Sequence, residues 1–350
     1  MREEEHALEQ SRDVIVVGAG IIGLACAHRL AADGRDVLCL ERGEPGGASS
    51  RAAAGMLAPV TEAEFGEEAL YELNIAAAER WPEFAQEIGA AAAGYRREGA
   101  LMVAGDRDDA EALQRVRGLR ERLGIASAWL TGKECRELEP GLSPRVPGGL
   151  LAPEDGQVDP RAVCAALVRA LGDRVRGGAE VRHLDRRSVT LAGGEIIRAE
   201  RIVVAAGAWS GDLAPVSVRP VKGQILRLRG PTVCQRIVRT PRCYVVPRED
   251  GRVVIGATVE DKGFDTRVTA EGVFRLLEAA REVLPDVDEL ELEEASAALR
   301  PGTPDNAPVV GEVEGLLVAT GHYRNGILHA PIAADAVAAL VAQRDWVGTG

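Results

Sequence analysis

The clearest hydrophobic pattern in the chain covers residues 13–41, which read DVIVVGAGIIGLACAHRLAADGRDVLCLE. An apolar run is followed by a helical repeat of apolar positions and then by a second apolar run. Gly18-x-Gly20-x-x-Gly23 lies between the first run and the repeat. In a strand–turn–helix unit, glycines at this spacing allow a tight turn, close approach of the backbone to a pyrophosphate and close packing of helix on sheet. With Glu41 at the end of the second run to accept ribose hydroxyls, the pattern predicts a dinucleotide-binding unit.

Further along the chain, helical spacing covers residues 67–93, where Pro82 is expected to kink or divide the helix, and about 108–123. Asp159-Pro160 is typical of a helix start. The stretches AEVRHL and SVTLAGGEIIRAERIVV predict short strands joined by tight turns. After the last of these, Ala-Ala-Gly207 is expected to pass near a bound nucleotide.

Between about 216 and 297, apolar and polar residues alternate as in antiparallel strands, with a helix over about 270–283. The last fifty residues return to strand and helix. This order predicts an α/β nucleotide-binding domain made of 1–85, 145–215 and 298–350. A mainly antiparallel α+β domain, 86–144 and 216–297, would be inserted into it.

Composition narrows the possible functions. The net charge of −12 over 350 residues argues against nucleic-acid binding, which needs clustered Lys and Arg. No run approaches the roughly 18 uninterrupted apolar residues of a membrane span. The first twelve residues are acidic, unlike a secretory signal peptide, and are expected to form a frayed extension. Six cysteines without ligand-like spacing fit reduced thiols in a cytoplasmic protein and indicate neither a disulfide framework nor a metal site.

The chain resembles the D-amino-acid oxidase superfamily of flavoproteins and, within it, the glycine oxidase branch linked to thiazole synthesis. The resemblance depends on the glycine unit and on SSRAAAGML, PVKGQ, CYVVPR, ALRPGTPD, GLLVATG and GHYRNGILHAP. It implies a Rossmann-like FAD-binding domain of the glutathione-reductase type with the inserted substrate domain, and noncovalent FAD whose flavin ring lies between the two.

The resemblance also implies the residues that hold FAD. The phosphates and ribose would contact the glycine unit and the end of the second strand. The flavin and its ribityl chain would contact the SSRAAAGML segment, and the pyrimidine edge of the flavin would lie along the GHYRNGIL loop. These residues are Gly18, Gly20, Ile21, Ile22, Gly23, Glu41 and Arg42; Ser49, Ser50, Ala54, Gly55 and Met56; Val181 at the adenine end; and His322, Tyr323, Arg324, Asn325, Gly326, Ile327 and Leu328.

For the substrate, Arg300 matches the family's carboxylate-binding arginine. Tyr244 matches a tyrosine that donates a hydrogen bond to the same carboxylate, and Arg324 matches a second basic residue near the flavin. A guanidinium can hold a carboxylate through two parallel hydrogen bonds, which fixes both position and orientation. A purely structural role remains an alternative for each of these three residues. For Arg324 the structural role and substrate binding carry equal weight. Arg242 and Val259 stand where a glycine oxidase of this branch has histidine and methionine, which leaves the preferred amine open.

The implied reaction is oxidation of glycine, and of sarcosine or small D-amino acids, to an imino acid, by hydride transfer to flavin N5 and reduction of dioxygen to hydrogen peroxide. The product would hydrolyse or pass to a thiazole-forming partner, and the enzyme would be a homo-oligomer. His322 is expected to structure its loop and not to act as a base. The alternatives are an FAD-dependent amine dehydrogenase with another electron acceptor, a nucleotide-binding scaffold without chemistry, and a nicotinamide dehydrogenase.

Overall fold

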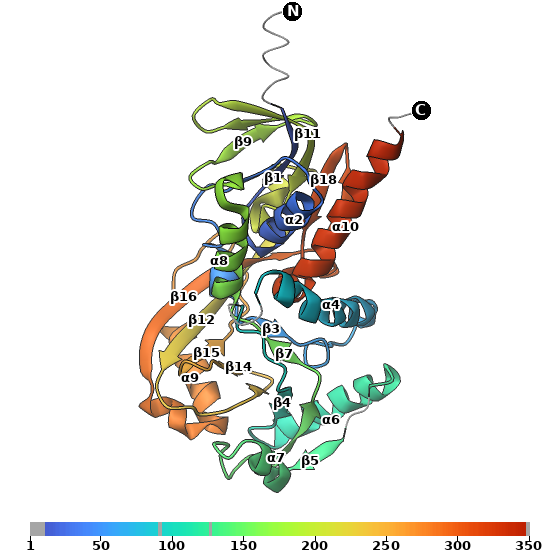
Figure 1. Cartoon of the computed structure of the whole chain (residues 1–350). Coiled ribbons are helices and arrows are strands. Elements are labelled where there is room, and N and C mark those ends of the chain that lie inside the picture. The colour runs from blue at the N-terminus through green and yellow to red at the C-terminus, as the bar shows by residue number, and fades with distance from the viewer. Residues whose placement is uncertain (1–10, 90–92, 126–127, 348–350) are drawn as a thin grey trace, which may run out of the picture.

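The computed structural model describes residues 11–89, 93–125 and 128–347. The extension predicted before the first strand therefore lies mostly outside the described residues, as do residues 90–92 near the end of the helix predicted over 67–93. Figure 1 shows two sheets, one in the half of the molecule where the described part of the chain starts and ends, and the other in the opposite half.

The first sheet is built around β1 (Arg12–Val17), whose Val14, Ile15 and Val16 are completely buried. Its strands follow the order β17 (Val309–Val313), β18 (Leu316–Thr320), β11 (Ile196–Val204), β1, β2 (Val37–Leu40) and β8 (Val175–Arg176). All neighbours in this order are parallel except β17 and β18. Because Val17 pairs with both Leu40 and Val204, the carboxyl ends of β1, β2 and β11 meet at one edge. Ligands of open α/β sheets bind at this edge.

Four helices and β1 share one hydrophobic core on one face of this sheet. Leu24, Trp81, Leu167 and Val337, one from each helix, belong to that core. The helices are α2 (Ile21–Ala32), α4 (Glu68–Glu87), α8 (Pro160–Leu171) and α10 (Gly326–Val347). The predicted start of α8 is confirmed, since Asp159 caps it by accepting from the Arg161 N–H at 3.0 Å.

The opposite face of the sheet is covered by an antiparallel excursion of β9 (Val181–Leu184) and β10 (Ser188–Leu191), which pairs with β11. The strands joined by tight turns are thus confirmed. Of the kink or division predicted at Pro82, the division is absent, since α4 is one helix that continues through Pro82 and ends at Glu87. Trp81 and Phe84, on either side of the proline, are buried, and their packing offsets the backbone hydrogen bond that Pro82 cannot donate.

The second sheet has eight strands and is antiparallel throughout except between its fifth and sixth strands in the order that follows. Its order is β16 (Glu291–Gly302), β12 (Arg219–Arg229), β15 (Arg252–Gly256), β14 (Tyr244–Pro247), β13 (Ile237–Arg239), β4 (Ala100–Val103), β6 (Gly148–Ala152) and β5 (Trp129–Thr131). The predicted helix α9 (Ala270–Val283) packs on one face through Leu276 and Val283. The other face, through Ile225 and Val246, packs on Ala54 and Val60 of the chain that leaves the first sheet.

Shorter elements complete the chain. They are α3 (Ser49–Ala52), the pair β3 (Met56–Leu57) and β7 (Gly156–Gln157), α6 (Arg107–Arg122), α7 (Gly132–Leu138), and the 3₁₀ turns η1 (Gly172–Arg174), η2 (Gly207–Asp212), η3 (Pro285–Glu289) and η4 (Tyr323–Asn325).

The α/β fold class with a mainly antiparallel second sheet is confirmed. The exact domain division remains a prediction, and two strands bear on its boundaries. β6 falls within the predicted segment 145–215 but pairs with β4 and β5 of the second sheet. β16 continues past residue 298 to Gly302, so this boundary lies inside a strand.

One stretch of the described chain, Tyr323–Gln343, is long and apolar enough to cross a membrane by length and composition. Of its most apolar window, 61% is buried inside the protein. This stretch contains most of α10, which packs on α2 and α4 in the shared core (Figure 1). It therefore has the surroundings of a core helix.

Candidate cofactor and substrate site

A cavity of about 690 Å³ extends from the carboxyl edge of the first sheet to the strands of the second. Its volume lies in the range of ligand pockets, roughly 300–1,000 Å³. Every predicted site residue lines it except Gly23 and Leu328. Leu328 is buried in the helical core, where its carbonyl oxygen accepts from the Trp81 indole at 2.8 Å, so its side chain lies outside the cavity.

The glycine turn has the geometry expected of its spacing. Gly18 has a φ of +103°, and a Cβ there would lie 2.5 Å from the Ala205 carbonyl oxygen. A Cβ on Gly23 would lie 1.8 Å from the Gly18 carbonyl oxygen, so Gly23 permits packing of the helix on the turn and does not reach the cavity. Gly20 differs, because the nearest atom to its Cβ position is the Ser50 hydroxyl at 3.5 Å. The space beside Gly20 is thus left free on the cavity side.

The N-terminus of α2 faces the cavity through Gly20, Ile21 and Ile22. Gly20 caps the helix without a side-chain hydrogen bond. The Ile21 N–H donates to the Ser50 hydroxyl at 2.9 Å, which ties α3 to this helix end. An exposed helix N-terminus with its partial positive charge is suited to bind phosphate oxygens.

Glu41 follows β2 at the same edge. Its carboxylate accepts from the N–H groups of Ala19 at 2.9 Å and Gly43 at 3.1 Å, which fixes it beside the glycine turn. The guanidinium of Arg42 lies 3.6 Å from the centre of the Trp209 ring. Trp209 lines the cavity and was not predicted. Val181 and Gly207 line the same part of the cavity, from β9 and η2.

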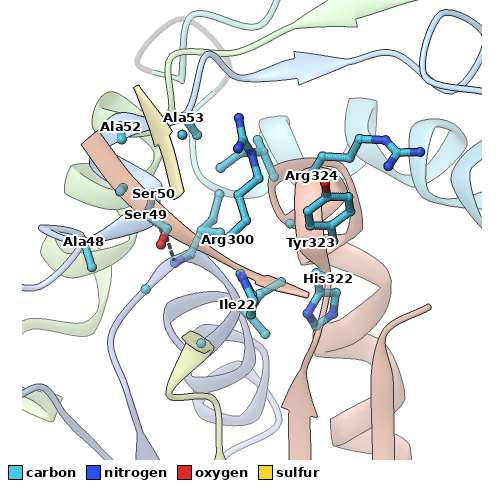
Figure 2. A pocket seen from close by; sticks show the side chains of 18 of the residues that line it. Ile22, Ala48, Ser49, Ser50, Ala52, Ala53, Arg300, His322, Tyr323 and Arg324 are labelled. Atoms are coloured by element: carbon cyan, nitrogen blue, oxygen red, sulfur yellow. Dashed lines mark hydrogen bonds between the residues drawn. The ribbon is translucent and has the colours of Figure 1, made fainter. Parts of the chain in front are cut away.

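The SSRAAAGML segment forms a second wall. Ala48, Ser49, Ser50, and Ala52 to Met56 all line the cavity. The Ser49 hydroxyl donates to the Leu299 carbonyl at 2.6 Å, which fastens this wall to β16 of the second sheet. Figure 2 shows Ala48, Ser49, Ser50, Ala52 and Ala53 on one side of the space and the loop of His322, Tyr323 and Arg324 on the other.

The loop carries a buried histidine. His322 is 2% exposed, and burial, with a smaller effect of His329, holds its pKa well below the usual value. The two rings contact edge to face at 5.8 Å between centroids. His329 binds the Asn74 side-chain oxygen through Nε2 at 2.6 Å. A neutral, buried imidazole pair of this kind fits the expected structural role of His322.

Arg300 extends from β16 into the space between the two walls (Figure 2). One of its terminal nitrogens donates to the Thr258 carbonyl oxygen at 3.1 Å. The side chain lies against Gly223, where a Cβ would be 2.4 Å from the guanidinium. Tyr244 similarly lies against Gly256, whose Cβ would be 2.5 Å from the phenol oxygen. Two glycines therefore make room for the two groups predicted to bind a carboxylate.

Tyr244 has a pKa raised by burial, although the positive charges of Arg300, Arg239 and Arg227 oppose the rise. The phenol is therefore protonated and can donate a hydrogen bond at neutral pH.

Arg324 lines the cavity, but Figure 2 shows its guanidinium pointing away from Arg300. It forms ion pairs with Glu62 at 3.1 Å, Glu64 at 3.4 Å and, more closely, Glu67. Its charge is thus already matched by carboxylates, which favours the structural alternative over substrate binding.

Arg239, a cavity residue that the sequence did not indicate, pairs with Glu62. Burial lowers its pKa to about 10, and the neighbouring Arg324 adds to the effect. No sequence motif marks Glu62 or Glu64, because they belong to an irregular stretch that only the fold brings beside β13. Arg242 and Val259, the two departures from the family pattern, also line the cavity; Arg242 pairs with Glu282 at the protein surface.

These features fit a dinucleotide whose reactive end lies near Arg300. One end of the cavity offers an open helix N-terminus and the Glu41 carboxylate, the middle offers small residues, and the far end offers a guanidinium and a phenol. All six cysteines are buried and unpaired. Among the described residues, no group of three or more His, Cys, Asp or Glu side chains could hold a metal ion.

Comparison with known proteins decides the family, since residues 13–340 match the DAO family of FAD dependent oxidoreductases. The chain belongs to this family. Its cofactor is accordingly FAD, and the reading as a nicotinamide enzyme or an inert scaffold is not supported.

Named relatives are similar over almost the whole chain. Glycine oxidase of Geobacillus kaustophilus is 34% identical over 95% of this chain and 93% of its own length. The crystal structure of that organism's glycine oxidase superimposes with a TM-score of 0.88, covering 95% of each chain. The bifunctional protein ThiO/ThiG of Trichormus variabilis is 35% identical over 95% of this chain, which spans only 53% of that relative's length.

Proposed function

We propose that the protein is an FAD-dependent oxidase of small amino acids, with glycine as the main substrate and sarcosine or small D-amino acids as further ones. The amine is oxidised to an imino acid, and dioxygen takes the two electrons and two protons to give hydrogen peroxide. The observation that carries the proposal is Arg300 beside Tyr244 in the cavity of an FAD family member, with relatives named glycine oxidase at nearly equal length.

Arg300 and Tyr244 bind the substrate carboxylate in this proposal. The guanidinium matches a carboxylate in charge and shape, and the protonated phenol donates a further hydrogen bond. Both groups are set by packing against Gly223 and Gly256, so the carboxylate is held in one place. Binding of this kind lowers the barrier mainly by orienting the reacting C–H bond.

FAD, when bound, supplies the electron acceptor. Its phosphates are assigned to Gly18, Gly20, Ile21 and Ile22, and its ribose to Glu41, with Arg42 alongside. The flavin and its ribityl chain are assigned to Ser49, Ser50, Ala54, Gly55 and Met56 and to the loop 322–327, and the nucleotide end to Val181 and Gly207. All of them line the same cavity, which supports the assignment.

No side chain in this proposal acts as a base on carbon. His322 is neutral and buried, and Arg324 is engaged by three carboxylates. We assign both to the structure of the loop that lines the cavity. The substrate amine enters the reaction unprotonated, so that its lone pair assists departure of the hydrogen.

An imino acid hydrolyses readily in water, so a partner that consumes it quickly would have an advantage. The ThiO/ThiG relatives join two proteins in one chain, which supports delivery of the imine to a thiazole-forming partner. A homo-oligomeric state and a cytoplasmic location complete the proposal, the latter supported by six unpaired cysteines.

The test uses the purified holoenzyme under air. Flavin absorbance bands together with peroxide formation from glycine, sarcosine and small D-amino acids would support the proposal. Substrate-dependent bleaching of the flavin without peroxide would favour the dehydrogenase alternative. A flavin that no amine in the panel reduces would refute amino acid oxidation.

A further inference from the structure

The wall formed by residues 48–56 is held from behind by arginines that do not reach the cavity. Arg227 of β12 donates through one nitrogen to the carbonyl oxygens of Arg51 at 2.6 Å and Ala52 at 3.2 Å. Arg161 of α8 adds a bond to the Arg51 carbonyl oxygen at 3.0 Å.

A third arginine binds the wall further along the chain. Arg248, the last residue of the CYVVPR motif, donates to the carbonyl oxygen of Ala54 and to the side-chain oxygen of Gln157. Neither Arg227 nor Arg248 lines the cavity, whereas Ala52, Ala53, Ala54 and Gly55 do. The two arginines therefore contact one side of this strip of backbone, and the cavity lies on its other side.

A trans peptide places its C=O and the following N–H on opposite sides. A guanidinium that binds the Ala54 carbonyl oxygen thus directs the Gly55 N–H the other way. Gly55 has a φ of +77°, and a Cβ there would lie 2.1 Å from the Val158 carbonyl oxygen, so the backbone is closely confined on that side as well.

We propose that Arg227 and Arg248 are positioning residues for FAD. They bind the carbonyl oxygens of Arg51, Ala52 and Ala54 on the side of the wall away from the cavity. In this way they fix the direction of the peptide groups that face the cofactor. The inference depends on FAD binding by this family and not on the proposed substrate.

Burial and charge make this arrangement more than a surface contact. Arg227 is 5% exposed and is partly balanced by Glu294 at 3.4 Å. Burial lowers the pKa of Arg227 and of Arg248 to about 10, so both stay charged at neutral pH. Two cations behind the strip add to its polarisation, and they favour negative charge on a group bound at its front.

The experiment compares the holoenzyme with Arg227→Met and Arg248→Met, which remove charge and donors, and with Arg227→Lys and Arg248→Lys, which keep the charge. Arg229→Met is the matched control, since Arg229 lies two residues along β12, is exposed and pairs with Glu293. The measurements are FAD release on dilution, followed by flavin fluorescence, the visible absorbance bands, and the midpoint potential of the bound flavin.

We expect the Met variants to bind FAD about tenfold to a hundredfold more weakly, the range for loss of a hydrogen bond to a charged group. Their midpoint potential should fall and their absorbance bands should shift, with the Lys variants in between. If the Met variants do not fold, the Lys variants decide, because one ammonium cannot reproduce a fixed fork of donors. FAD release, spectrum and potential equal to those of the control, despite a lower melting temperature, would overturn the inference. Since no measurement uses substrate, the outcome is independent of whether glycine is oxidised.

Discussion

Removal of the Arg300 guanidinium is the most direct test of the substrate site. In Arg300→Ala the carboxylate of a bound amino acid would lose its positively charged partner. Tyr244, which is uncharged, could not balance the negative charge of that carboxylate. Arg300→Lys keeps the charge but replaces two parallel donors with a single point of contact.

The expected size of the effect follows from the surroundings of the side chain. Arg300 is partly buried, lines the cavity and has one donor already bound to the Thr258 carbonyl oxygen. Truncation of one partner of a desolvated charge pair costs about 2–5 kcal/mol. This corresponds to a decrease in kcat/KM of about 30-fold to about 5,000-fold, carried mainly by KM if the ion pair forms already in the ground state.

The assay is initial-rate peroxide formation from glycine with each variant, with flavin content measured on the same samples. Arg107→Ala on α6 is the control, because it removes the same charge from a side chain that is 91% exposed. Flavin content should stay at the level of the unmodified protein in all variants. Unchanged kcat and KM for every amine in Arg300→Ala would refute the role assigned to this residue.

Three further changes test separate parts of the structure. Gly223→Ala should raise KM without loss of FAD, because its Cβ would lie 2.4 Å from the Arg300 guanidinium; Gly311→Ala, with no atom within 4 Å, is the kinetic control. Glu41→Ala should weaken FAD retention, and unchanged flavin after prolonged dialysis would argue against its ribose contact. Burial lowers the pKa of His329 from 6.5 to about 4, so unfolding is favoured as pH falls from 6.5 towards 4. That shift is worth roughly 3 kcal/mol, and His329→Gln should flatten the decline in melting temperature over this interval.

The local patterns predicted most of the secondary structure. Apolar runs gave β1 and β2, the glycine spacing gave the turn between β1 and α2, and Asp159-Pro160 gave the start of α8. Pro82 was expected to kink or divide its helix, and the helix is not divided there. Local propensity favoured a break there, and burial of Trp81 in the core opposed it.

The candidate site was predictable where a motif carries a residue into the cavity, as with Gly20 and Arg300. It was not predictable where a residue acts through partners far away in the chain. Leu328 belongs to the same string as the loop residues, yet one turn of helix carries it into the core. Glu62 and Arg239 have no signature at all, because their pairing depends on two segments that meet only in the folded protein.

The sequence by itself determined the nucleotide-binding unit and the two kinds of sheet, since these depend on spacing and alternation within short stretches. The residues for a carboxylate were implied by its resemblance to a known family. The tertiary structure decided which of these residues share a cavity. It also decided that Arg324 forms ion pairs with three glutamates, and that Arg227 and Arg248 donate hydrogen bonds to backbone carbonyl oxygens of the wall. Such pairings join residues more than a hundred positions apart. Their energies come from burial and charge in a common interior, which no local pattern records.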